Sequence, residues 1–278
     1  MFHILSASLR TGRVTTGYPW EPEAAPPAYR GQPTLDLDRC DRTGACVAAC
    51  PAAAIAVITQ RWELDLARCV FCGLCAEACP NAAIALSADF ELAARRRADL
   101  VLGADLRSQG TLPETGDVAT RAAATSALSG LARRLNDRIH RLLRRSLHIR
   151  HMDAGSDNST DWELNALLNP VYNVQRLGID FVASPRHADL LLVTGAVTRN
   201  LEMALRRTYE AMPEPRLVVA AGAEACGGGV LQGAYAVAGG VDRCLPVDVY
   251  IPGDPPRPQA IIQGLLIAMD RLKPKLPR

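Results

Sequence analysis

Residues 40–80, CDRTGACVAACPAAAIAVITQRWELDLARCVFCGLCAEACP, decide the fold of the first part of this chain. They contain seven of its nine cysteines. The segment is written twice, because LDLDRC at 35–40 returns as LDLARC at 64–69, and CPAAAIA at 50–56 returns as CPNAAIA at 79–85. The two copies are 29 residues apart throughout. We therefore expect two copies of one local structure.

The second copy has the spacing Cys-x2-Cys-x2-Cys-x3-Cys-Pro, from Cys69 to Pro80. This run is typical of bacterial ferredoxins, in which three closely spaced thiolates bind one iron–sulfur cluster and the fourth binds the other. A zinc site fits less well, because zinc takes four ligands in paired knuckles. Disulfides also fit less well, because the sequence shows no secretory signal. The spacing thus predicts two iron–sulfur clusters.

The first copy lacks one cysteine of the second, because Thr43 stands where the other copy has Cys72. With ligation crossed between the copies, one cluster receives four thiolates and the other receives three. The complete cysteine set, for a 4Fe–4S cluster, is Cys50, Cys69, Cys72 and Cys75. The incomplete cysteine set is Cys40, Cys46 and Cys79, with Thr43 at the fourth position. We expect a 3Fe–4S cluster or a labile 4Fe–4S cluster on it, and the sequence leaves both open.

The composition excludes several classes of function. A chain of 278 residues with 49% hydrophobic side chains can form two domains with cores of their own. Aromatic residues make up 5%, too few for a platform on which nucleic-acid bases stack. No apolar run approaches the roughly 18 residues that span a bilayer. We expect a soluble or peripheral protein of a reducing compartment, such as the bacterial cytoplasm.

Composition also divides the chain into parts. We expect a ferredoxin-like domain with an N-terminal arm at 1–102, a linker rich in small and polar residues at 103–127, and a second domain at 128–278. The many prolines of residues 1–33 argue against long helices. They predict an extended arm, wrapped on a partner or on the ferredoxin core, or else a disordered tail. Residues 88–102 have the pattern of a helix that closes the first domain.

Residues 128–145 have the pattern of a basic amphipathic helix. Leucine and isoleucine recur at helical spacing, and most of the arginines lie off that stripe. Such a helix can lie on an anionic membrane surface, dock on an acidic subunit, or be a solvated face with a packed underside. The sequence leaves these three open. Nucleic acid is the least favoured partner, because no aromatic residue lies among the arginines.

From residue 146 onward, short apolar segments alternate with helical patterns. Strands are expected at 147–152, 178–183, 189–193, 216–221 and 247–251, and helices at 162–168, 199–212 and 259–272. This alternation predicts a mainly parallel sheet, so the chain as a whole should be an α+β dicluster ferredoxin domain followed by an α/β flavodoxin-like domain. Such folds place their sites on the loops after the strands. These loops are 153–161, 195–198, 222–229 and 253–257.

Both halves resemble known families. The first resembles the polyferredoxin subunit of formate hydrogenlyase and of related membrane-bound group 4 NiFe hydrogenases. It shares with them the two cysteine runs and the pairs Thr11-Gly12, Tyr18-Pro19, Glu21-Pro22 and Arg30-Gly31. Residues 128–272 resemble the small subunit of those hydrogenases, which is similar to the 20 kDa subunit of NADH-quinone oxidoreductase. The segments that carry this are VASPRHAD at 182–189, TGAVT at 194–198 and PVDVYIPG at 246–253.

The resemblance implies a natural fusion of two subunits that are usually separate. It further implies an iron–sulfur electron-transfer subunit whose partners are a large subunit and membrane subunits of a hydrogenase or complex I type. The expected location is peripheral, on the cytoplasmic face of the inner membrane. We expect a subunit of an oxidoreductase complex rather than an enzyme that acts alone, and no catalytic residues of its own.

In that family the small subunit binds a 4Fe–4S cluster, called proximal, through cysteines on three loops. Here none of those positions is a cysteine: they are Ala154, Asp157, Thr160, Glu224 and Asp254. Cys226 lies two positions past an expected ligand, and Cys244 belongs to a different loop. One thiolate cannot hold a cuboidal cluster. We therefore expect that the second domain keeps the fold and has lost the cofactor.

Two further hypotheses follow from the missing cysteines. Asp157, Glu224 and Asp254 could together bind a hard cation such as Mg²⁺, Ca²⁺ or Mn²⁺, since three carboxylates suit such ions. Alternatively they surround water, or pair with Arg186, His187 or arginines of a partner. As for function, the alternative to electron transfer is a structural or regulatory subunit of a related ion-translocating complex without redox catalysis.

Overall fold

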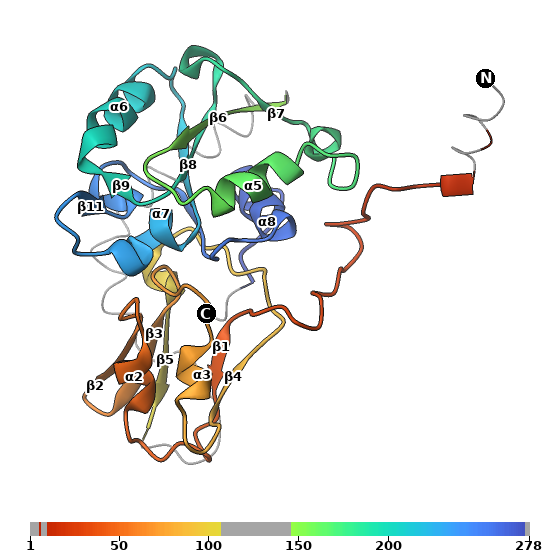
Figure 1. Cartoon of the computed structure of the whole chain (residues 1–278). Helices are drawn as coiled ribbons and strands as arrows, with labels where there is room; N and C mark the ends of the chain where they lie inside the picture. The colour runs from red at the N-terminus through yellow and green to blue at the C-terminus, as the bar shows by residue number, and fades with distance from the viewer. Residues whose placement is uncertain (1–5, 7–9, 107–145, 276–278) are drawn as a thin grey trace.

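The computed structural model describes residues 6, 10–106 and 146–275 of the chain. The other residues are drawn as a thin grey trace in Figure 1. The basic stretch 128–145 and most of the expected linker therefore lie outside the described residues. Within the described ranges, no helix combines the length and the apolar character needed to cross a bilayer.

The ferredoxin domain is the lower lobe in Figure 1. Each cysteine run leads into a short helix, α2 (Ala45–Ala49) in the first copy and α3 (Leu74–Glu77) in the second. Two antiparallel strand pairs accompany them: β1 (Pro33–Leu35) with β4 (Ile84–Leu86), and β2 (Ile55–Ile58) with β3 (Arg61–Asp65). The pairs are equivalent under the repeat, because Pro33 lies opposite Leu86 as Trp62 lies opposite Val57. The expected dicluster ferredoxin fold is confirmed.

The helix expected at 88–102 is wrong. A 3-10 turn, η1 (Arg97–Leu100), leads instead into strand β5 (Val101–Asp105), which pairs antiparallel with β3. Strand β3 pairs with β2 along one edge, and the backbone N–H and C=O groups along its other edge need hydrogen-bond partners, which β5 supplies. Leu100 is fully buried, so packing also fixes this segment. Tertiary contacts therefore outweigh the helical spacing of the sequence.

The second domain, the upper lobe in Figure 1, is built on a parallel five-stranded sheet in the order β12-β10-β8-β6-β7. Its strands are β6 (Leu147–Asp153), β7 (Ile179–Phe181), β8 (Leu190–Thr194), β10 (Leu217–Ala221) and β12 (Val249–Ile251). A small antiparallel pair joins β9 (Val197–Thr198) to β11 (Val237–Gly239). All five expected strands are present, and the flavodoxin-like α/β fold is confirmed.

Helices cover both faces of this sheet. They are α5 (Ser159–Ala166), α6 (Arg199–Glu210), α7 (Ala223–Gly227) and α8 (Pro258–Ala268), with 3-10 turns η2 (Val174–Leu177), η3 (Pro185–His187), η4 (Gly229–Leu231) and η5 (Val241–Arg243). Leu190 and Leu192 of β8 belong to the core with α5 and α8, whereas Leu191 and Val193 belong to the core with α6 and α7. Burial on both faces explains why β8 and β10 are continuously apolar.

The two domains share one core. Ala94 N donates to Tyr250 O at 3.0 Å, and Tyr250 N donates back to Ala94 O at 2.8 Å. At another point Gly227 lies so close that a Cβ built on it would be 2.6 Å from the Ala67 carbonyl oxygen. The hydrophobic cluster of the ferredoxin domain continues without a break to Cys226. The cysteine-rich loops are therefore held rigidly against the second domain.

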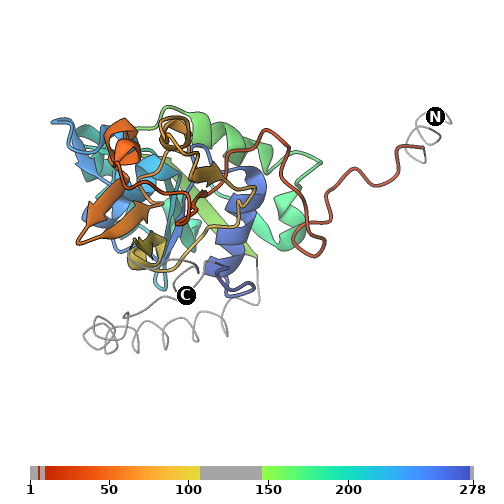
Figure 2. The same cartoon turned by 90° about the horizontal axis from the view of Figure 1, so that it is seen from below.

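The N-terminal arm is an extended segment that contacts the second domain. Thr16 N donates to Val171 O at 2.8 Å, and the Arg176 guanidinium donates to the carbonyl of Tyr18. Tyr18 is buried, and its hydroxyl donates to Glu91 at 2.7 Å. The described residues before these contacts lead away from the body, as Figures 1 and 2 show. The second domain was not among the surfaces expected for the arm.

Candidate functional site

The two cysteine loops have the same backbone conformation. Left-handed residues recur 29 positions apart as Arg42 and Phe71, as Gly44 and Gly73, and as Ala53 and Ala82. A positive φ is uncommon for any residue other than glycine, so the loop shape is specific and costs free energy. Such a conformation persists only where surrounding interactions over-determine it. The first loop therefore keeps the shape of the second, although Thr43 replaces a cysteine.

Backbone N–H groups point at the thiol sulfurs. Ala54 N donates to Cys50 Sγ at 3.2 Å, and its equivalent Ala83 N donates to Cys79 Sγ at 3.2 Å. Phe71 N donates to Cys69 Sγ at 3.4 Å. Hydrogen bonds to cluster sulfurs are one means by which proteins set the potential of an iron–sulfur cluster. The donor groups present thus fit the expected cofactor.

Electrostatics indicates which thiols lie together. The pKa of Cys69 is raised to about 12, mainly by burial and also by the neighbouring Cys75, Cys50 and Cys72. These four are the complete cysteine set. Burial likewise raises the pKa of Cys75 to about 11, with Cys72 as the largest contribution from a neighbour. Two of the four cysteines, Cys69 and Cys75, are buried, so their thiolates need positive charge nearby, and cluster iron supplies it.

In the incomplete set, Cys46 and Cys40 influence each other, and Thr43 is engaged within its own loop. Burial raises the pKa of Cys46, and Cys40 raises it further as the neighbouring thiol. The Thr43 hydroxyl donates to Asp41 Oδ1 at 2.9 Å, and Thr43 N donates to the same oxygen at 3.1 Å. The hydroxyl is therefore engaged within its own loop. The assignment of both cysteine sets as ligands stays a prediction.

Among the described residues, no three His, Cys, Asp or Glu side chains are arranged to bind a single metal ion. A 4Fe–4S cluster takes its four thiolates on four different irons, so its ligands are spaced more widely than those of one ion. The absence of such a group therefore concerns single-ion sites, such as one on the carboxylates of the second domain. It does not concern clusters bound by the cysteines.

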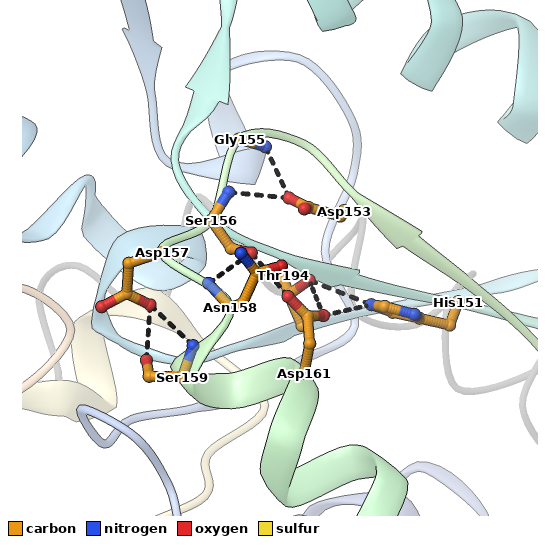
Figure 3. A network of polar contacts seen from close by, with 9 residues as sticks. All are labelled: His151, Asp153, Gly155, Ser156, Asp157, Asn158, Ser159, Asp161 and Thr194. Carbon is orange, nitrogen blue, oxygen red and sulfur yellow. Dashed lines mark hydrogen bonds and ion pairs between the residues drawn. The ribbon is translucent and has the colours of Figure 1, made fainter.

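In the second domain, loop 153–161 is closed by its own acidic side chains (Figure 3). Asp153 Oδ1 accepts hydrogen bonds from Gly155 N and Ser156 N, both at 2.7 Å. Asp157 Oδ1 accepts from Ser159 N at 2.8 Å and from its hydroxyl at 2.6 Å. Such turns satisfy backbone donors that have no other partner. Asp157 thus holds the start of α5 in place.

A polar network that the sequence did not indicate lies beside this loop (Figure 3). His151 Nε2 is 2.8 Å from Asp161 Oδ1 and 3.0 Å from Thr194 Oγ1. Thr194 Oγ1 donates to Asp161 Oδ1 at 2.8 Å, and Ser156 Oγ donates to Asp161 Oδ2 at 2.5 Å. Burial lowers the pKa of His151, against the opposing effect of Asp161. His151, Asp161 and Thr194 were missed because they come from three different elements.

The positions at which the resemblance implied cysteines do come together. Ala154 is fully buried, and a Cβ built on Gly222 would be 2.7 Å from Thr160 Oγ1. The pKa of Glu224 is raised to about 7, first by burial and then by Asp157 and Asp254. The pKa of Asp254 is raised to about 6 by burial and by Asp157. The three carboxylates are therefore close enough to influence one another electrostatically, and a hard cation between them stays a prediction.

The two remaining cysteines are outside this arrangement. Cys226 is fully buried, and its thiol donates to Ala220 O at 3.4 Å. Cys244 lies after η5, where Arg206 donates to its carbonyl oxygen at 2.8 Å. Burial raises the pKa of Cys226 to about 12, so its thiol stays protonated at neutral pH.

Comparison with known proteins gives two family matches. Residues 158–268 match the family described as NADH ubiquinone oxidoreductase, 20 Kd subunit, and residues 39–83 match the 4Fe-4S dicluster domain. The order of the two matches is that of the two domains. The resemblances drawn from the sequence are confirmed for both halves.

Individual relatives each match between about a third and a half of this chain. A probable membrane-bound hydrogenase subunit mbhJ of Pyrococcus furiosus is 43% identical over 143 residues, which are 50% of this chain and 86% of the relative. Formate hydrogenlyase subunit 7 of Escherichia coli is 41% identical over 48% of this chain and 52% of its own length. An NADH-quinone oxidoreductase subunit of Citrifermentans bemidjiense is 50% identical over 36% of this chain and 59% of its own length. This chain thus spans only about half to three fifths of the last two relatives.

Proposed function

Because the chain belongs to the family of the NADH ubiquinone oxidoreductase 20 kDa subunit and carries a 4Fe-4S dicluster domain ahead of that region, we propose that it is an iron–sulfur electron-transfer subunit. The assembly it serves is a membrane-associated oxidoreductase of the hydrogenase or complex I type. Relatives with the names of a membrane-bound hydrogenase subunit and of an NADH-quinone oxidoreductase subunit support this type of assembly.

One observation carries the proposal. Cys69 of the complete cysteine set lies near helix α7, which follows β10, because a Cβ built on Gly227 would be 2.6 Å from the carbonyl oxygen of Ala67, two residues before Cys69. Helix α7 also contains Glu224, which stands where the family resemblance implies a cysteine ligand of the proximal cluster. Electrons on the cluster of the complete set would therefore stand directly beside the second domain. A ferredoxin domain tethered at random would not make such a contact.

The cofactors proposed are one 4Fe–4S cluster on the complete cysteine set and one 3Fe–4S or labile 4Fe–4S cluster on the incomplete set. When bound, each cluster accepts and gives up single electrons. The residues of the chain hold the sulfurs, donate backbone N–H groups to them and exclude water by burial. The shared core fixes the clusters relative to the second domain, which steadies the distance over which electrons pass.

We further propose that the proximal cluster has been lost and that the second domain is a docking scaffold for a large subunit. Support comes from the residues at Ala154, Asp157, Thr160, Glu224 and Asp254, none of which is a thiol. Cys226 uses its thiol as a donor within the core. Hydrogen bonds of loop 153–161 to itself keep the site folded without a metal.

The partners proposed are a hydrogenase-type or complex I-type large subunit and membrane subunits. Attachment is peripheral, through the complex, on the cytoplasmic face of the inner membrane. The proposed division into 1–102, 103–127 and 128–278 matches this role, with one domain for electron transfer and one for docking. The electron donor and acceptor are those of the complex.

A structural or regulatory subunit without redox catalysis is the second candidate. The observation in its favour is the polar network of His151, Asp161 and Thr194. This network stabilises the region of the implied proximal-cluster site through hydrogen bonds and needs no cluster. In that case the clusters of the ferredoxin domain would serve only to hold the fold.

One experiment separates the two candidates. The tagged full-length chain is isolated from native membranes, its partners are identified, and electron transfer through the complex is compared between wild type and Cys72→Ala. The electron-transfer function predicts a complex that assembles with the variant and no longer passes electrons. Unchanged turnover with Cys72→Ala would contradict it and favour the structural role. Cys244→Ala, a cysteine of neither set, is the matched control.

A further inference from the structure

The indole N–H of Trp62 is a buried donor without an acceptor. The side chain is 5% exposed, and its Nε1 is one of the few buried side-chain nitrogens of the described residues that make no hydrogen bond. Leaving a buried donor unpaired carries the desolvation cost of that group. An orphaned donor in a folded core therefore needs an explanation, such as a group that is bound when the protein is complete.

A candidate acceptor is the sulfur of Cys46. Both residues belong to the same hydrophobic core, Trp62 from β3 and Cys46 from α2. The indole is near enough to lower the pKa of the Cys46 thiol, against the larger raising effect of burial. It does not meet the geometry of a hydrogen bond to a neutral thiol. A thiolate is a much stronger acceptor than a thiol and draws donors closer.

The repeat places this donor beside the incomplete cysteine set and gives the complete set no equivalent donor. The strand pair β1 and β4 is equivalent to the pair β3 and β2, and Pro33 occupies the position of Trp62. By the same repeat, Cys75 of the complete set is the equivalent of Cys46. Proline has neither a side-chain donor nor a backbone N–H. The two sites, otherwise alike in backbone, therefore differ at this donor as well as at Thr43.

We propose that the indole N–H of Trp62 donates a hydrogen bond to the Cys46 thiolate of the loaded protein and raises the reduction potential of the cluster on the incomplete set. This inference rests on the proposed function, because it requires a cluster on Cys40, Cys46 and Cys79. The reduced cluster carries one more negative charge than the oxidised cluster. A donor aimed at its sulfur stabilises the reduced form more, so the potential rises.

The test is a redox titration, followed by EPR, of the anaerobically purified full-length chain. Trp62→Phe keeps an aromatic ring in the core and removes the N–H. We expect the equilibrium between oxidised and reduced cluster to shift about tenfold toward the oxidised form, which is about 59 mV for a one-electron couple. The cluster of the complete set should keep its potential. Trp162→Phe, at a tryptophan that is 73% exposed on α5, should change neither cluster.

A measurement on the wild-type chain keeps the inference testable if Trp62→Phe does not fold. The chain is labelled with ¹⁵N at the indole nitrogens, and pulsed EPR is recorded in the paramagnetic state of the cluster. A ¹⁵N coupling supports the hydrogen bond, because Trp20 and Trp162 are both largely exposed. Unchanged potentials in Trp62→Phe, or no ¹⁵N coupling in a chain that holds both clusters, would overturn the inference. A chain without cluster signals would instead overturn the proposed function itself.

Discussion

Thr43 is the residue on which the difference between the two cluster sites chiefly depends. The backbone around it already has the shape found around Cys72, since Arg42 and Gly44 are left-handed like Phe71 and Gly73. Its hydroxyl donates to Asp41 and is a poor substitute for a thiolate. A thiol at this position would therefore need no change in the loop to join the three cysteines of the incomplete set.

We predict that Thr43→Cys adds about one iron atom per chain, by completing a set of four thiolates. It should also abolish an oxidised-state EPR signal of a 3Fe–4S cluster. The measurement is the iron content and EPR spectrum of the anaerobically purified full-length chain. Thr208→Cys, on α6 and away from both sets, is the control. A wild-type chain with two equally stable 4Fe–4S clusters would contradict this account of Thr43.

Glu224 makes the stability of the second domain depend on pH. Its pKa in the folded chain is about 7, raised by burial and then by Asp157 and Asp254. In the unfolded chain the carboxyl loses its proton near pH 4.3. Between these values the folded chain holds a proton that the unfolded chain has released, so stability falls as pH rises through this window.

We predict that Glu224→Gln removes this part of the pH dependence. The amide does not titrate, so the unfolding temperature of the variant should rise relative to wild type as the pH goes from 4.5 to 7 and then level off. Thermal unfolding of both chains across this range is the measurement. Glu214→Gln, whose side chain is 82% exposed, is the control. Parallel curves for Glu224→Gln and wild type would contradict the effect.

At the residue scale, spacing in the sequence predicts which cysteines bind the clusters, but it does not indicate the network of Figure 3. The seven cysteines lie close together along the chain, so their spacing alone restricts their geometry. His151, Asp161 and Thr194 come from β6, α5 and β8. Their approach depends on the register of two parallel strands, in which Asp153 lies opposite Thr194. No local pattern encodes that register.

At the scale of elements, apolar runs predicted the strands of the second domain well because both faces of β8 and β10 are buried. The pattern failed at 88–102, where the edge of β3 recruits β5. It also left the arm undecided, because several of its contacts use backbone groups, such as the hydrogen bond from Thr16 N to Val171 O and the carbonyl of Tyr18 that accepts from Arg176. Backbone contacts leave little trace in residue type.

For the basic stretch 128–145, which lies outside the described residues, the sequence alone gives a testable expectation. We predict that reversing Arg134, Arg138 and Arg141 to glutamate weakens attachment of the full-length chain to its complex or to anionic vesicles. Each basic residue near an anionic surface contributes about 1 kcal/mol, so binding should fall by 100-fold or more. Attachment of the wild type should weaken with salt.

The measurement is co-sedimentation with vesicles at low ionic strength, and retention in the complex during purification. Replacing the same three arginines with lysine keeps the charge and should keep the attachment. If the glutamate variant binds as wild type does at low ionic strength, the stretch is only a solvated face.

At the scale of the whole molecule, the two domains act as one body because they are joined through backbone as well as side chains. Gln263 of α8 donates from Nε2 to Glu91 O at 3.2 Å and accepts from Ala93 N at 3.3 Å. Together with the bridge between Ala94 and Tyr250, this closes the segment between the domains on the second sheet. The sequence predicted two domains and no junction of this kind, since the contacts are nonlocal.

We predict that Gly227→Ala destabilises the junction by about 1 to 3 kcal/mol, the usual cost of overpacking. The new Cβ would lie 2.6 Å from the Ala67 carbonyl oxygen, which belongs to backbone and cannot rotate away. The free energy of unfolding in denaturant is the measurement. Gly103→Ala is the control, because its Cβ would meet only the end of the Arg61 side chain, which is 48% exposed. Equal losses in the two variants would argue against a tight junction.

The central claim is that the chain carries two clusters, both in the ferredoxin domain, and none in the second domain. The most direct test is the iron and sulfide content of the anaerobically purified full-length chain, together with its EPR spectrum. We predict about seven or eight iron atoms per chain and signals from two clusters, of which only the one on the incomplete set loses iron readily. About twelve iron atoms and a third cluster signal would contradict the account.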